Sequence, residues 1–168
     1  SPEPPEPYAV VPAFPQLKFV KPTSVEEFPD AERLLVTEMS GKVYGFPHDA
    51  ATREADVILD LVDLLPDDLK PNGVSLFDAQ FAKNRYLFVS YVHPGEGKHT
   101  RLSRFTLDGT ASPRAVAGSE QVLLTWPAGG HNGGCLEFGT DGYLYISTGD
   151  GTGPNPPDGL TTGQTVTD

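Results

Sequence analysis

The chain has 168 residues, and its 23 acidic against 12 basic side chains give a formal net charge of −11 at pH 7. Nucleic-acid binding depends on contacts of Lys and Arg with phosphates, so this balance argues against a nucleic-acid-binding protein. The uninterrupted apolar runs are far shorter than the roughly 20 residues of a transmembrane helix, so we expect no membrane span. The 18 glycines and 17 prolines disfavour helical bundles and are typical of short strands joined by turns.

The two ends of the chain differ in composition from its middle. Residues 1–16 begin with a segment rich in proline and glutamate, which favours extended, solvated chain, and we interpret them as a tail or linker. Residues 161–168 are polar and contain no closing strand, so we expect the sequence to be a piece of a longer protein. The single cysteine, Cys135, excludes an internal disulfide and a cysteine-based zinc site.

Three short segments, rich in β-branched and aromatic residues and bounded by turn formers, predict buried strands. They are residues 33–39, 86–92 and 143–148, and their first residues are 53 and then 57 positions apart. Such spacing fits one four-stranded blade of a β-propeller, whose repeats span roughly 40 to 50 residues. We therefore predict an all-β protein of about ten strands, a partial β-propeller of two to three four-stranded blades from a ring of about four to eight.

Further strands are predicted beside these segments, at residues 73–77 and 134–138 before the second and third and at 41–46 and 100–107 after the first and second. A helix is considered only for residues 57–69, whose apolar positions fit an outer strand or one to two helical turns. Of these two, we favour a strand followed by a turn.

Asp-Gly pairs predict tight turns, because glycine readily takes the positive φ that such turns require. One pair is Asp108–Gly109, and another lies in residues 140–142, between the segments 134–138 and 143–148. If the latter two form a hairpin, the residues before its first strand lie beside those after its second. The sequence therefore predicts that His131 and Asp150 lie at the same rim of the molecule.

The chemistry of this pair suggests a catalytic base. Glycines flank His131, so its imidazole can face open space. A neighbouring carboxylate fixes the tautomer of a histidine and stabilises its protonated form, which suits the removal of a hydroxyl proton. The alternative is structural: Asp150 caps a turn with Gly151 while His131 bonds to a loop.

Other motifs predict no further site. Residues 149–153 do not lie between a strand and a helix, as a dinucleotide fingerprint must, and they lack the early ligands of an EF-hand, so no metal ligands are assigned. The remaining histidines, His48, His93 and His99, have no ligand spacing and are expected at the surface.

Residues 131–150, with the sequence HNGGCLEFGTDGYLYISTGD, closely resemble the signature of the glucose/sorbosone dehydrogenase family, which includes quinoprotein glucose dehydrogenases and aldose sugar dehydrogenases. Residues 33–43 and 84–92 resemble strands of its first blades. The resemblance covers about residues 17–168, which we interpret as the N-terminal part of the family's six-bladed propeller.

The resemblance implies oxidation of the anomeric carbon of a sugar by pyrroloquinoline quinone (PQQ), with calcium as a second cofactor. His131 matches the family's catalytic base at the quinone, and Asp150 matches the acid that supports it. Most cofactor ligands are then expected beyond residue 168, so the chain alone is expected to be inactive. The resemblance also implies a sugar substrate, an electron acceptor such as a cytochrome c, and a secreted or periplasmic location.

Two departures from the family pattern bear on the substrate. Gly130 stands where glucose-oxidising members often have an acid, and residues 71–78 lack the Gln and the His-Pro of some relatives, so glucose itself is not assigned. Propellers also serve as binding platforms, and a non-catalytic module that contacts protein or carbohydrate is the alternative function.

Overall fold

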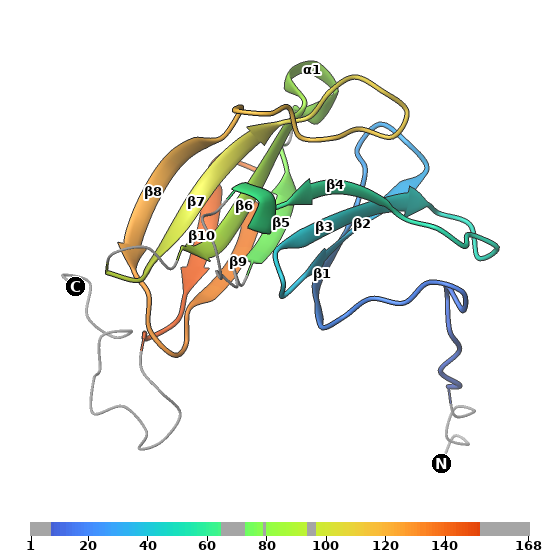
Figure 1. Ribbon diagram of the computed structural model, residues 1–168, viewed down its shortest axis with the longest axis horizontal. Helices are drawn as coiled ribbons and strands as arrows, with labels where there is room; N and C mark the ends of the chain where they lie inside the picture. The colour runs from blue at the N-terminus through green and yellow to red at the C-terminus, as the bar shows by residue number, and fades with distance from the viewer. Residues whose placement is uncertain (1–7, 65–72, 79, 94–96, 152–168) are drawn as a thin grey trace, which may run out of the picture.

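The computed structural model describes residues 8–64, 73–78, 80–93 and 97–151. Within these residues, ten strands form two four-stranded antiparallel sheets and one hairpin (Figure 1). The first sheet contains β1 (Pro22–Glu27), β2 (Arg33–Glu38), β3 (Lys42–Pro47) and β4 (Asp56–Asp60); the second contains β5 (Gly73–Phe77), β6 (Tyr86–His93), β7 (His99–Thr106) and β8 (Gln121–Pro127); the hairpin contains β9 (Gly133–Phe138) and β10 (Leu144–Thr148). In each sheet the strands follow one another in chain order.

This architecture confirms the predicted all-β partial propeller. The three strands that defined the repeat, β2, β6 and β10, begin at Arg33, Tyr86 and Leu144 and are the second strands of their sheets. The first strands also correspond, because β5 contacts both β1 and β9. The favoured interpretation of residues 57–69 is confirmed where the structure describes them, since β4 is followed by a single 3₁₀ turn at Val62–Leu64; residues 65–69 lie outside the described part.

The expectation of a helix only at residues 57–69 is wrong, because α1 spans Phe81–Asn84. Its four residues are too few to show a helical period in the sequence. The turn is anchored by the fully buried side chain of Phe81. It ends at Arg85, which has a positive φ of 60° and donates its N–H to the carbonyl of Phe81.

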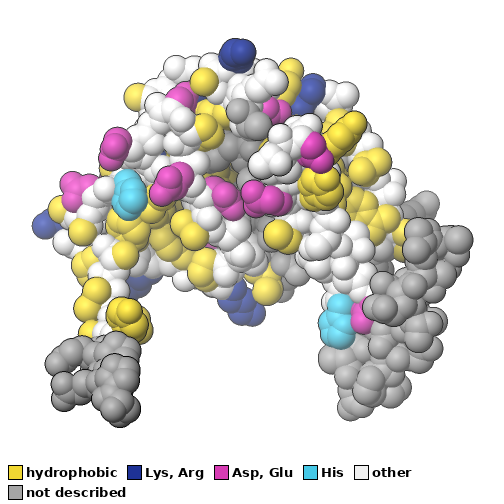
Figure 2. Space-filling view, turned by 180° about the vertical axis from the view of Figure 1, so that it is seen from behind, with side chains coloured by type: hydrophobic (Ala, Val, Ile, Leu, Met, Phe, Trp, Pro, Cys, Tyr) yellow, Lys and Arg dark blue, Asp and Glu magenta, His cyan; other side chains and the backbone are white. Residues whose placement is uncertain are grey.

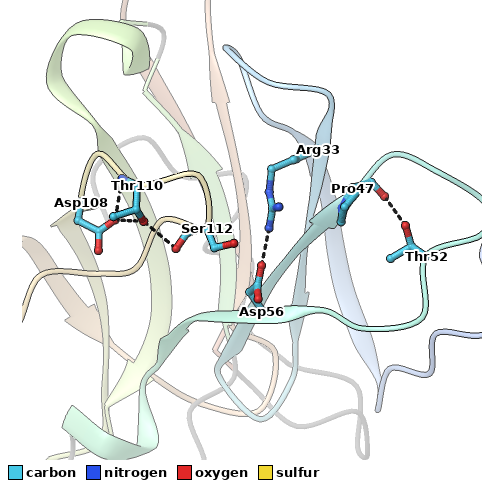
Figure 3. Close-up of polar contacts among 7 residues, drawn as sticks. All are labelled: Arg33, Pro47, Thr52, Asp56, Asp108, Thr110 and Ser112. Carbon is cyan, nitrogen blue, oxygen red and sulfur yellow. Dashed lines mark hydrogen bonds and ion pairs between the residues drawn. The ribbon is translucent and has the colours of Figure 1, made fainter.

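The Asp108–Gly109 pair does not form the predicted tight turn. It lies in the long connection between β7 and β8, and Gly109 is not among the described residues with positive φ. Asp108 instead accepts hydrogen bonds from the N–H and the hydroxyl of Thr110, at 3.1 and 2.7 Å (Figure 3).

Strand β6 is covered on both faces of the second sheet, which explains its continuous apolar sequence. Successive side chains of a strand point to opposite faces. Leu87, Val89 and Tyr91 belong to the core shared with the first sheet, whereas Phe88 packs with Leu136 of the hairpin. Because both faces exclude water, β6 needs no polar face and shows a buried run rather than simple alternation.

The outer face of the first sheet is covered by the chain that precedes β1. Phe14 packs edge-on against Phe46, with ring centroids 5.0 Å apart. Leu17 and Phe19 join the same cluster. The side chain of Phe14, within the segment interpreted as a tail, therefore contributes to the packing of the first sheet.

Polar contacts link the first and second sheets at their seam. Within the first sheet, Arg33 of β2 donates to Asp56 of β4 at 2.8 Å, next to this seam (Figure 3). Ser112, in the connection between β7 and β8, interacts with the carboxylate of Asp56 and helps to lower its pKa. Arg85 pairs with Asp30 across the same seam. The contacts of Ser112 and Arg85 therefore connect the two sheets beside their shared apolar core.

The surface reflects the acidic composition. Acidic side chains gather in a band across the face in Figure 2, above a region of hydrophobic side chains. The helices in the described part of the chain have three and four residues, and neither is long enough to cross a membrane.

Candidate functional site

The β9–β10 hairpin brings together the two residues that the sequence singles out. The strands pair antiparallel with Thr148 opposite Gly133, around a turn in which Gly142 has a φ of 83°. The segment before β9 therefore lies beside the segment after β10. This confirms that His131 and Asp150 share one rim.

The imidazole of His131 contacts the carboxylate of Asp150, with Nδ1 and Oδ1 3.1 Å apart. An ionised carboxylate can only accept hydrogen bonds, so Nδ1 carries the proton and Nε2 keeps a lone pair in the neutral ring. The two side chains are 48% and 31% exposed. Nε2 is thus the atom of this pair that can accept a proton from a molecule bound at the rim.

Backbone hydrogen bonds fix the two segments that carry these side chains. The N–H of Gly130 donates to the carbonyl of Gly151 at 3.1 Å, and the N–H of Gly151 donates to the carbonyl of His131 at 2.9 Å. His131 and Asp150 are therefore held opposite each other by their neighbours as well as by their own contact.

Glycines permit this close approach. A Cβ on Gly149 would lie 2.2 Å from the carbonyl oxygen of His131, and one on Gly133 would lie 2.5 Å from the nitrogen of Gly149. Gly133 also has a φ of 67°, which side chains disfavour. The glycines flanking His131 thus serve backbone packing as well as the open space expected from the sequence.

Asn132 is a site residue that sequence reasoning missed. Its Oδ1 accepts the N–H of Gly129 at 2.8 Å, and its Nδ2 donates to the carbonyl of the same residue at 3.1 Å. The signal was present, because Asn among glycines often bonds to nearby backbone. The hydrogen-bond partner, however, becomes evident only from the folded loop.

The sequence of the chain matches the family described as glucose/sorbosone dehydrogenase over residues 19–165. The chain belongs to the glucose/sorbosone dehydrogenase family. Members with solved structures share its fold. The PQQ-bound aldose sugar dehydrogenase of Streptomyces coelicolor superposes with a TM-score of 0.63 at 19% identity, over 80% of this chain and 39% of that one.

Two further solved structures are similar. The soluble aldose sugar dehydrogenase of Escherichia coli, in its apo form, gives a TM-score of 0.61 at 19% identity, over 78% of this chain and 38% of that one. A glucose dehydrogenase gives a TM-score of 0.58 at 25% identity, over 77% of this chain and 38% of that one. The chain therefore spans about two fifths of the length of these family members.

The other histidines make contacts of their own. His48 is exposed, as expected, and its ring lies against Phe14. His93 and His99 are partly exposed and stack on each other with centroids 5.0 Å apart, a contact that the sequence did not predict. Burial, and then the charge of Arg101, lowers the pKa of His93.

The cofactors of this family can be compared with the groups that the described residues offer. The ring of His131 is half-exposed and flanked by glycines, so a bound molecule can reach it. The described residues contain no group of three His, Cys, Asp or Glu side chains that could hold a metal ion. The rim thus offers an accessible imidazole, and the His, Cys, Asp and Glu side chains of the described residues form no cluster for calcium.

Proposed function

We propose that the intact protein containing this chain oxidises an aldose, or a related sugar alcohol carbon, with PQQ as the electron acceptor. Family membership supports the class of reaction. The observation that carries the proposal for this chain is the contact of His131 with Asp150 at an accessible rim. A base directed by a carboxylate is what the oxidation of a hydroxyl-bearing carbon needs.

His131 acts as the general base in this proposal. Its Nε2 accepts the proton of the C1 hydroxyl while the C1 hydrogen leaves with its electron pair, so that a C=O bond forms at C1. PQQ, when bound, supplies the acceptor of that hydride. The sugar loses two electrons, and the proton remains on His131 until it passes to solvent.

Asp150 orients the base and balances its charge. The hydrogen bond from Nδ1 keeps the proton away from Nε2 before the reaction. After proton transfer the ring is a cation, and the carboxylate at 3.1 Å stabilises it. Asp150 therefore does not touch the sugar and supports proton transfer through His131.

The finer features of the proposal follow from the family resemblance. Calcium and the carboxylates of PQQ are bound by residues outside the described part of the chain. A soluble electron acceptor such as a cytochrome c reoxidises the quinone, and the protein acts in a secreted or periplasmic location.

The test is dye-linked oxidation of a panel of aldoses by the intact protein loaded with PQQ and Ca²⁺. His131→Ala is expected to lower kcat by roughly 10²- to 10⁴-fold, the usual contribution of a positioned acid or base. His48→Ala, which changes an exposed histidine far along the sequence, is the matched control and should retain wild-type turnover. Wild-type turnover in His131→Ala would overturn the assignment of the base. Absence of quinone-dependent oxidation in the wild type would favour a non-catalytic binding module.

A further inference from the structure

The loop that carries His131 is closed by one side chain. The side-chain amide of Asn132 accepts the N–H of Gly129 and donates to its carbonyl. These two hydrogen bonds close the loop of residues 129–132. Asn132 itself is half-buried. Only a side chain with a donor and an acceptor on one planar group can make this pair of bonds at the observed distances.

A loop of this composition requires such a restraint. Glycine loses more conformational freedom on folding than any other residue, and Gly129, Gly130, Gly133 and Gly134 surround His131 and Asn132. The two backbone bonds at Gly130 and His131 tie the centre of the loop to residue 151. The Asn132 amide ties its two ends to each other.

The restraint acts on the orientation of His131. Its ring is 48% exposed, so packing restricts it little, and its direction depends on its backbone and on Asp150. The hydrogen bonds join Gly129 to Asn132, and these two residues directly flank Gly130 and His131. Fixing these two ends fixes the direction in which the Cα–Cβ bond of His131 points.

We propose that Asn132 is a positioning residue, which holds the loop 129–132 so that Nδ1 of His131 faces Asp150 and Nε2 faces the substrate side of the rim. This inference deepens the function proposed above and rests on it for its consequence in catalysis. The effect of Asn132 on the histidine itself is independent of any activity.

The first measurement is the tautomer of His131, read from the nitrogen chemical shifts of ¹⁵N-histidine-labelled intact protein at alkaline pH. In the wild type the proton is expected on Nδ1, where Asp150 accepts it. Asn132→Ala removes both loop bonds, so the His131 signal is expected to move toward the Nε2–H form that free imidazole prefers. Asn132→Asp keeps an acceptor for the Gly129 N–H and is expected to retain more of the Nδ1–H form.

The matched control is Asn84→Ala. Asn84 also makes a local turn bond, accepting the N–H of Tyr86 at 3.0 Å, but it lies before β6 rather than in the loop of His131. Its replacement should leave the His131 signal unchanged. If Asn132→Ala does not fold, Asn132→Asp, which loses only the bond from Nδ2, is expected to show a smaller shift in the same direction, and an unchanged His131 signal in that variant would count against the inference.

The second measurement is turnover in the protein loaded with PQQ and Ca²⁺. Asn132→Ala is expected to lower kcat about 10- to 100-fold with little change in KM, since a misplaced reacting group slows chemistry more than binding. A wild-type tautomer and wild-type kcat in Asn132→Ala would overturn the inference. A shifted tautomer in a protein whose wild type oxidises no aldose would support the positioning role and reject the proposed function.

Discussion

Gly149 lies against the backbone of His131: a Cβ at position 149 would stand 2.2 Å from the carbonyl oxygen and 2.5 Å from the carbonyl carbon of that residue. Gly149 directly precedes Asp150. The glycine therefore allows the two segments of the rim to approach until the imidazole and the carboxylate meet.

Gly149→Ala is expected to separate these segments. The methyl group has backbone, rather than a flexible side chain, as its neighbour, so the chain itself must move. Overpacking of this kind costs about 1 to 3 kcal/mol, and we expect the contact between Nδ1 and Oδ1 to be lost. Thermal unfolding and the tautomer of His131 measure the two effects.

Gly109→Ala is the control for that substitution. A Cβ at Gly109 would have no atom within 4 Å, and its φ is not positive. The free energy of unfolding of Gly109→Ala should be close to that of the wild type. Equal stability of both variants, with an unchanged His131 signal, would show that residue 149 does not need to be glycine.

The charge of Asp150 can be separated from its shape. Asp150→Asn keeps the size of the side chain but removes the carboxylate that stabilises the protonated ring. In the protein loaded with PQQ and Ca²⁺, we expect kcat to fall about 10²-fold or more, with a smaller change in quinone affinity. Steady-state kinetics and quinone titration test this, and equal loss of affinity and turnover would contradict a role in proton transfer.

The parts of this molecule that the sequence predicts are those set by local patterns. The strand positions, the hairpin turn at Gly142 and the meeting of His131 with Asp150 follow from short β-branched and aromatic segments, the turn residues between them and antiparallel pairing. The helix at Phe81–Asn84 could not be predicted in this way, because a single buried side chain from the fold holds it.

Contacts made by loops were the least predictable. Asp108–Gly109 has the composition of a hairpin turn, yet Asp108 bonds to Thr110 within a long connection that also reaches the first sheet through Ser112. The stack of His93 on His99 likewise depends on the register of β6 and β7, in which the two residues are partners. Neither relationship is contained in the local sequence.

The ion pair at the seam predicts a dependence of stability on pH. Hydrogen bonds from Arg33 and then from Ser112 hold the pKa of Asp56 below its ordinary value of 3.8. Folding therefore favours the ionised carboxylate, so this contribution is present above about pH 4 and is lost as the pH falls through the lowered pKa. Asp56→Asn should destabilise the protein at neutral pH and weaken the loss of stability in acid.

Urea unfolding at neutral pH and at about pH 3 measures this contribution. The side chain of Asp56 is 40% exposed, so we expect a loss of no more than about 1 kcal/mol at neutral pH. Asp63→Asn, at an exposed position after the same strand, is the control for removal of a charge. The same pH dependence in Asp56→Asn and in the wild type would contradict the role of the pair.

A half-buried carboxylate, that of Glu120 before β8, bonds to two buried residues of β6 and β7. Oε1 of Glu120 accepts hydrogen bonds from the hydroxyl of Tyr91 at 2.5 Å and from that of Ser103 at 2.7 Å. Tyr91 and Ser103 are 1% and 0% exposed. Burial, and then the hydrogen bond to Glu120, raises the pKa of Tyr91.

Removing the acceptor is expected to cost more than removing one donor. Glu120→Ala leaves two buried hydroxyl protons without this acceptor, at roughly 1 to 3 kcal/mol each, whereas Tyr91→Phe removes one hydrogen bond worth about 0.5 to 1.5 kcal/mol. In the Glu120→Ala background, Tyr91→Phe removes a hydroxyl that has already lost its carboxylate acceptor and should therefore cost less stability than in the wild type. Chemical unfolding of the two single variants and the double variant gives the coupling energy. If Tyr91→Phe destabilises both backgrounds equally, the two side chains are not coupled, and the buried tyrosine stabilises the sheet through packing alone.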